Sequence, residues 1–284
     1  MTRRSRRPRN IGAHLVLLVG VAVLVFPVYM AFIGSTHDAA TIGRGRLPLT
    51  PGSHLAENYV QAWVYGTGER VSGTPVRVMM ANSLVMAIVI AVGKISVSLL
   101  AAYAVVFFRF PGRMFFFWLI FITLMLPLEV RIIPSYKVVS DFGLLNTLAG
   151  LTIPLMVSAT GTLLFRQVFM TIPKELLDAA KIDGAGPMRC LWSIILPLGR
   201  PSIAALFVIL FVYGWNQYLW PLLITTERNM DTIVIGIVKM LGTSESLMDW
   251  NLVMATTVMA MAVPIAVVIL FQKWLVQGLV ETEK

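Results

Sequence analysis

The chain contains 284 residues, of which 57% are hydrophobic and 13% are charged. A soluble domain of this length cannot bury so much apolar side chain, so lipid is expected to cover part of its surface. The net charge of +9 does not indicate a nucleic-acid-binding protein, because the basic residues flank apolar runs instead of lining a polar groove. A single cysteine, Cys190, excludes an internal disulfide, and the sequence predicts no metal site.

The N-terminal segment carries five arginines within its first nine residues, directly before an apolar run from Ala13 to Gly34. Clustered arginines beside an apolar run are typical of the cytoplasmic end of a membrane helix. A cleaved signal peptide is the alternative, with Ala39 and Ala40 as its cleavage site, but such a peptide has an apolar core of only about 7 to 15 residues. The twenty-two-residue run therefore predicts a retained transmembrane helix.

Apolar runs of about twenty residues predict an all-α, polytopic membrane protein with six transmembrane helices. The predicted spans cover residues 13–34, 78–106, 114–133, 149–168, 203–225 and 251–275. When Arg131, Arg166 and Lys273, which lie near span ends, are counted with the nearer side, fourteen Lys and Arg residues lie on the side of the two termini and eight on the opposite side, while Lys94 lies inside the second span. The positive-inside rule then places both termini in the cytoplasm.

The predicted organisation follows from these spans. The divisions are a basic cytoplasmic N-terminus (1–12), a first transmembrane helix (13–34), an external loop (35–77), a transmembrane core (78–275) and a cytoplasmic tail (276–284). The external loop is rich in Gly, Pro and Thr and is long for a connection in a helical bundle, so we expect it to meet a partner. Trp215, Tyr218 and Trp220 lie near the outer end of the fifth span, where an interfacial aromatic belt is one interpretation.

One cytoplasmic connection, residues 169–200, is long and patterned enough to predict two short helices. Pro173 suits the first turn of the first helix, and Gly184 can take the left-handed conformation that ends it. Gly186 and Pro187 can start the second helix. The first helix is expected to place Leu176, Ala179, Ala180 and Asp183 on one face, with Glu175 and Asp178 near its positive end.

Two interpretations of this segment follow. Composition alone permits an amphipathic helix at the membrane interface, with Lys181 and Arg189 pairing with lipid headgroups. The spacing Asp178-Ala179-Ala180, three residues, Gly184, nine residues, Ile194, one residue, Leu196-Pro197 resembles the signature of permease subunits of binding-protein-dependent ABC importers. The first position of that signature is Glu in the family and Asp178 here. The resemblance implies a coupling helix seated in a cleft of the ATP-hydrolysing subunit, with the contact residues Glu175, Asp178, Ala179, Ala180, Asp183 and Gly184.

A wider resemblance covers nearly the whole chain and is strongest to the maltose-type carbohydrate permeases. It rests on Phe165-Arg166-Gln167, Ile182-Asp183-Gly184-Ala185 and the stretch from Trp215 to Leu222. Within that class the chain looks most like permeases of sn-glycerol-3-phosphate importers, on the stretch Phe121 to Pro127, on Glu129-Val130-Arg131 and on the stretch Tyr213 to Tyr218. The resemblance implies import of sn-glycerol-3-phosphate or related glycerophosphodiesters. A neutral sugar or oligosaccharide is the alternative within the family.

The chain has no phosphate-loop motif, so ATP and Mg²⁺ are expected on a partner ATPase and this subunit is expected to be non-catalytic. A membrane-embedded hydrolase is the alternative from a different class, but His14, His37 and His54 form no nucleophilic arrangement with Ser and carboxylate residues. The resemblance implies a bacterial inner-membrane location. It also implies a second homologous permease, an ATPase dimer and an external solute-binding protein as partners, with surrounding lipid and no nucleic acid.

Polar residues at membrane depth are further candidates, because each is costly unless it is paired or faces water. We expect Lys94 to extend toward a carbonyl or headgroup at the interface. Glu129 and Arg131 are either an exposed ion pair or part of the substrate pathway, where Arg131 would offer a planar fork to a phosphate. Asn216 and Gln217 either line that pathway or, as we favour, form interhelical hydrogen bonds.

Overall fold

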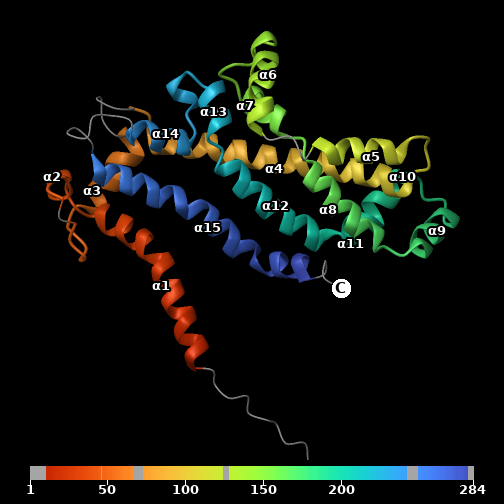
Figure 1. Ribbon diagram of the computed structural model, residues 1–284, viewed down its shortest axis with the longest axis horizontal. Helices are drawn as coiled ribbons and strands as arrows, with labels where there is room; N and C mark the ends of the chain where they lie inside the picture. Colours follow the sequence, from red (N-terminus) through yellow and green to blue (C-terminus); the bar gives the residue numbers. More distant parts are fainter. Residues whose placement is uncertain (1–10, 46, 67–72, 124–127, 242–248, 281–284) are drawn as a thin grey trace, which may run out of the picture. The chain divides into compact units, whose positions relative to one another are not determined.

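The computed structural model describes residues 11–45, 47–66, 73–123, 128–241 and 249–280 (Figure 1). Within these ranges the regular structure is helical and contains no strand, which confirms the all-α prediction. The arginine cluster within residues 1–10 lies outside the described residues. Three helices are long: α1 (Ile11–Gly34), α4 (Val76–Phe107) and α15 (Trp250–Val280).

The remaining helices are shorter. They are α2 (Ala39–Gly43), α3 (Leu55–Val60), η1 (Gln61–Tyr65), α5 (Arg113–Ile122), α6 (Leu128–Asp141), α7 (Leu148–Thr152), η3 (Ile153–Leu155), α8 (Ala159–Met170), α9 (Lys174–Ile182), α10 (Pro187–Cys190), η4 (Leu191–Ile195), α11 (Leu196–Leu198), α12 (Arg200–Trp215), α13 (Leu219–Ile224), η5 (Arg228–Met230) and α14 (Ile233–Leu241).

The helices confirm a polytopic membrane protein. Three stretches, Gly12–Gly34, Val76–Phe107 and Trp250–Val276, are long and apolar enough to cross a bilayer. Two bent pairs also qualify if each is one broken span, which brings the described candidates to five. The predicted span at 114–133 contains α5, which has ten residues, and residues 124–127, which lie outside the described part of the chain. A sixth span therefore stays a prediction.

The chain divides into two compact units, and the first comprises Met1–Pro75 and Lys239–Met259. Its α1 has a mean hydropathy of 2.7 and is almost entirely exposed, as expected of a helix that lipid or another subunit covers. The predicted external loop is ordered around Asn58, whose amide donates to the carbonyl oxygens of Ser35 (2.9 Å) and His37 (2.8 Å). Asn251 Nδ2 in turn donates to Asn58 Oδ1 at 2.8 Å, which ties this loop to the start of α15.

The second unit comprises Val76–Val238 and Ala260–Lys284, and α4 is its central helix. α4 packs most extensively against α12 and α8. Small residues permit this close approach: a Cβ atom added at Gly214 of α12 would lie 2.9 Å from Ala87 Cα of α4. On α8, Gly161 is similarly close to the Ser98 side chain of α4.

A buried apolar cluster holds α4, α6, α7 and α13 together within the second unit. Its members are Met86, Ile90, Val139, Leu151, Leu155, Trp220 and Ile224. The Trp220 indole N–H donates to the Gly150 carbonyl oxygen at 3.1 Å, so this buried side chain has a hydrogen-bond partner. Trp215 and Trp220 are 3% and 1% exposed, which contradicts an interfacial belt for these two residues.

Candidate functional site

The segment 169–200, which carries the importer-like spacing, folds as two short helices joined by a tight turn. α9 (Lys174–Ile182) begins directly after Pro173, and α10 (Pro187–Cys190) begins after Gly186. Glu175 lies in the first turn of α9 and Lys181 in its last, so each charge interacts favourably with the helix dipole. The prediction of two helices with these boundaries is confirmed.

Gly184 ends α9 through its left-handed backbone. Its φ is +74°, the Gly184 N–H donates to the Lys181 carbonyl at 3.0 Å, and the Ala185 N–H donates to the Ala180 carbonyl at 2.8 Å. These two bonds form a Schellman motif, in which the residue after the C-cap has a positive φ. The predicted left-handed conformation of Gly184 is therefore confirmed.

α9 presents a mixed surface outward. Exposed residues include Glu175, Leu176, Asp178, Ala179, Ile182 and Asp183, with Ile182 at 87%. Leu177 and Ala180 are buried against the rest of the chain, so Ala180 does not share the exposed face on which we expected it. Sequence reasoning did not select Ile182, although a large apolar side chain so exposed is a natural contact for another protein.

The inner side of this segment is anchored to the end of α4. The Tyr103 hydroxyl donates to the Pro187 carbonyl at 2.8 Å, and Leu177, Cys190 and Phe107 line a cavity of about 230 Å³ with it. The Asp178 to Lys181 ion pair, at 2.9 Å, lies on the exposed side, where it contributes little to stability. The α9–α10 segment thus packs against the C-terminal end of the long helix α4.

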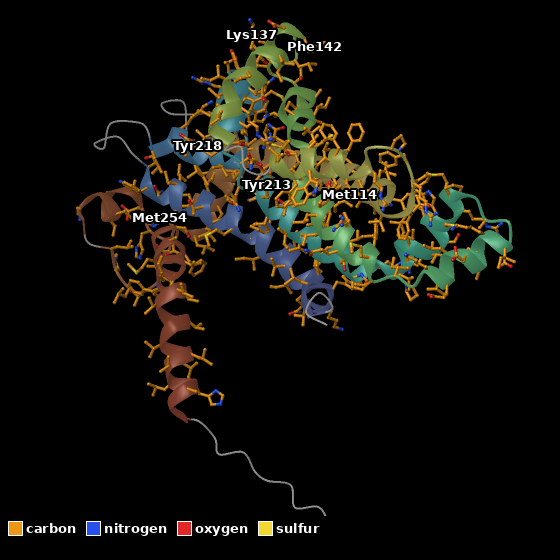
Figure 2. The ribbon with its side chains drawn as sticks, turned by 45° about the vertical axis from the view of Figure 1, so that its right-hand side comes forward. Met114, Lys137, Phe142, Tyr213, Tyr218 and Met254 are labelled. Atoms are coloured by element: carbon orange, nitrogen blue, oxygen red, sulfur yellow. The ribbon has the colours of Figure 1, made fainter. Side chains whose placement is uncertain are left out.

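A second group of candidate residues lies around Tyr213, in the interior of the second unit (Figure 2). The Lys94 ammonium nitrogen lies 3.8 Å from the centre of the Tyr213 ring, and Lys94 is only 7% exposed. Lys94 lies eighteen residues after Val76 and thirteen before Phe107, or about 27 and about 20 Å from the ends of α4. The described contact of the Lys94 ammonium is thus an aromatic ring, and the position of Lys94 relative to the membrane interface stays a prediction.

The chain leaves the helical conformation next to this tyrosine. α12 ends at Trp215 and α13 begins at Leu219, so Asn216 and Gln217 lie in the break. Asn216 is exposed and caps α12, while Gln217 Nε2 donates to the Tyr213 carbonyl at 3.1 Å. The described bond of Gln217 is thus to the backbone four residues earlier, and an interhelical bond from Gln217 stays a prediction.

Glu129 and Arg131 both lie in the first turn of α6. Arg131 is exposed. The Glu129 side chain lies outside the described part of the structure. An ion pair between Arg131 and Glu129, and a place for either residue in the substrate pathway, stay predictions.

The model of the family described as "Binding-protein-dependent transport system inner membrane component" matches residues 94–281. This match covers the α9 segment and the surroundings of Tyr213, and it extends over more than half of the chain. The chain belongs to this family.

Relatives within the family extend over the full length of the chain. The sn-glycerol-3-phosphate transport system permease protein UgpE of Rhizobium meliloti (strain 1021) is 56% identical over 281 residues, which are 99% of each chain. The protein of the same name from Agrobacterium fabrum (strain C58 / ATCC 33970) is also 56% identical, over 280 residues and 99% of each chain.

A solved structure shares the fold of this family member. It is the crystal structure of a bacterial ABC transporter involved in the import of the acidic polysaccharide alginate. One of its chains superposes with a TM-score of 0.80, covering 96% of this chain and 98% of that one at 22% identity. At this identity the likeness establishes the all-helical permease fold.

Proposed function

We propose that the chain is the permease subunit of an ATP-driven importer of sn-glycerol-3-phosphate or related glycerophosphodiesters in the bacterial inner membrane. The observation that carries this proposal is the 56% identity, over 99% of the chain, to permeases named for sn-glycerol-3-phosphate transport. The chain forms one half of the pathway and a second homologous permease forms the other. An external binding protein delivers the solute, and a separate ATPase dimer binds ATP and Mg²⁺.

The α9 segment supports the coupling part of the proposal. Glu175, Asp178, Ala179 and Asp183 are exposed on α9, and Gly184 holds the turn that follows. These residues, together with Ile182, are assigned to the contact with the ATPase. Ala180 supports the same helix from its buried side.

The proposed function requires a topology in which both termini and α9 lie in the cytoplasm and residues 35–77 lie outside. Reporter fusions at Asn10, Gly68, Gly184 and Thr282 check this orientation. We expect the fusion at Gly68 to give a periplasmic signal and the other three fusions to give cytoplasmic signals. A cytoplasmic signal at Gly68 or an external signal at Gly184 would refute the topology.

Arg131 is proposed to recognise the negatively charged phosphate group of the solute. A phosphate ester moving through a low-dielectric pathway loses hydration worth several kcal/mol, and a guanidinium offsets part of that loss with a bidentate hydrogen bond. We expect Arg131→Gln to lower uptake of labelled sn-glycerol-3-phosphate about tenfold or more, and Arg131→Lys to recover part of it.

Lys137→Gln is the matched control, because Lys137 is an exposed cation on the same helix, and Figure 2 shows it near the tip of α6, away from Tyr213. Uptake by this variant should equal that of the unmodified importer. Uptake of a neutral sugar, but not of the phosphate ester, by the unmodified importer would replace the proposed solute with the neutral-sugar alternative. Unchanged phosphate-ester uptake by Arg131→Gln would remove Arg131 from the pathway.

A further inference from the structure

The second unit carries an apolar groove that the proposed coupling and solute roles leave unexplained. The groove lies between α4, α12 and the later part of α15, and its volume is about 490 Å³. Cavities of about 300 to 1,000 Å³ are typical of small-molecule sites. Among the described residues that line the groove, Arg200 is the charged one, Ser96 is polar and the others are apolar.

α12 forms one wall of the groove with a stripe of residues that begins with a cation. Arg200, Ile203, Ala204 and Phe207 follow one another at the spacing of a single helix face. Arg200 is the first residue of α12, so its charge marks one end of this stripe. About 10 Å of apolar wall follows it. This arrangement matches an amphiphile, which has a polar head and a hydrocarbon tail.

Aromatic rings join the α12 wall to α15. The ring centres of Phe207 and Phe271 lie 5.5 Å apart, and those of Phe271 and Trp274 lie 5.4 Å apart. Trp274 is 46% exposed, and Val92 on the α4 side is 49% exposed, so the groove is open at the surface of the helices. Lipid surrounds such a surface in a membrane protein, and tryptophan is enriched where headgroups meet hydrocarbon.

The charge of Arg200 is complementary to an anionic headgroup. Arg200 is exposed, and the ion pair recorded among the described side chains joins Lys181 to Asp178. None of the described lining residues is acidic. A guanidinium binds phosphate oxygens with a planar fork of N–H donors, and basic pockets between membrane helices bind anionic lipid headgroups. A zwitterionic lipid would bring an ammonium group close to the same cation, which is less favourable.

We propose that this groove binds an anionic phospholipid, with an acyl chain along α12 and the phosphate paired with Arg200. Ile203, Ala204 and Phe207 contact the acyl chain. The imported solute does not fit this role, because a glycerophosphodiester has no hydrocarbon tail to fill the apolar walls. The inference goes beyond the proposed function and holds whichever solute the importer carries.

The test measures contact between lipid and Trp274 in proteoliposomes that hold the complete importer. The bilayer is phosphatidylcholine with a small, equal mole fraction of either phosphatidylglycerol or phosphatidylcholine that carries bromine on its acyl chains. Bromine quenches tryptophan fluorescence at contact, and the difference from a Trp274→Phe importer isolates the emission of Trp274. We expect brominated phosphatidylglycerol to quench Trp274 about fivefold more efficiently than brominated phosphatidylcholine.

Arg200 variants test the headgroup contact. Arg200→Gln should make the two brominated lipids equally efficient, whereas Arg200→Lys keeps the charge and should retain most of the preference. Lys273→Gln is the matched control, because Lys273 is an exposed cation next to Trp274 in α15 and does not line the groove. The preference should be unchanged in this variant. An equal loss in Lys273→Gln and Arg200→Gln would show a general surface-charge effect and overturn the site.

Two further variants keep the proposal testable if Arg200→Gln fails to assemble. Ala204→Leu fills the apolar wall and keeps Arg200, so it should reduce the preference, and an unchanged preference would reject the acyl-chain position. A variant with Glu281→Gln and Glu283→Gln removes two carboxylates that follow α15 and lie outside the described residues. The preference should persist in it. If Arg200→Gln then has no effect in this background, Arg200 serves these carboxylates and the inference is wrong.

The remaining outcomes also decide the question. Equal quenching of Trp274 by both brominated lipids in the unmodified importer would show contact with bulk lipid only, and the proposed site would be wrong. Quenching by neither lipid would show that protein, such as the second permease, covers the groove, and this result also rejects the site. The assay contains no solute, so its failure leaves the proposed function untouched.

Discussion

Gly184→Val is expected to abolish solute-stimulated ATP hydrolysis by the assembled importer. The Gly184 φ of +74° belongs to the left-handed region, which costs an ordinary residue about 1 to 2 kcal/mol and a β-branched residue more. A valine would favour another backbone conformation and break the two hydrogen bonds that close α9. Since α9 is the proposed contact with the ATPase, the displaced turn would prevent the solute from stimulating ATP hydrolysis.

Gly186→Val is the matched control for this experiment. Gly186 lies two residues away in the same turn, and a Cβ atom at either glycine meets nothing within 4 Å. The Gly186 φ of −68° with ψ of 167° is a conformation that valine adopts readily. We expect near-normal stimulated ATPase activity from Gly186→Val and at least a tenfold loss from Gly184→Val. Equal activities would contradict the role of the left-handed turn in coupling.

Gly214→Leu is expected to have the largest effect on stability. The contact between α12 and α4 is the most extensive in the second unit, and a Cβ atom at Gly214 would approach Ala87 Cα to 2.9 Å. The neighbour is backbone, which cannot rotate away, so the helices must separate. Overpacking of this kind costs about 1 to 3 kcal/mol, and we expect a value of about 3 kcal/mol or more.

The measurement is the amount of folded protein extracted from the membrane and the temperature at which it unfolds in detergent. Gly20→Leu on α1 is the matched control, because Gly20 is also a helical glycine in an apolar span and a Cβ atom there meets nothing within 4 Å. We expect normal yield and unfolding temperature for Gly20→Leu, with both reduced for Gly214→Leu. Normal values for Gly214→Leu would show that α4 and α12 tolerate separation at this point.

The long spans and the α9 turn could be predicted because their causes are local in sequence. An apolar run of sufficient length requires a membrane helix wherever it packs. The end of α9 depends on hydrogen bonds within residues 180–185, so Gly184 alone marks the position. The same holds for α10, which starts at Pro187, where the missing N–H costs nothing.

The position of each side chain around a helix depended on the tertiary structure. α4 has apolar residues on every side, so its sequence does not show which face meets α8, α12 or lipid. The contact between Lys94 and Tyr213 could not be predicted for this reason, because Tyr213 comes from a helix more than a hundred residues later. Ala180 faced inward for a related reason: the end of α4 covers one side of α9.

The sequence by itself determined the class of protein, the long apolar spans and the α9 motif, since each rests on composition or on spacing within a few residues. Only the tertiary structure decided that α12 stops beside Tyr213, that Trp215 and Trp220 are buried, and that Lys94 lies over the Tyr213 ring. These features arise from contacts between segments far apart in the chain. Such contacts are selected by the shape and charge of both partners, which no local pattern records.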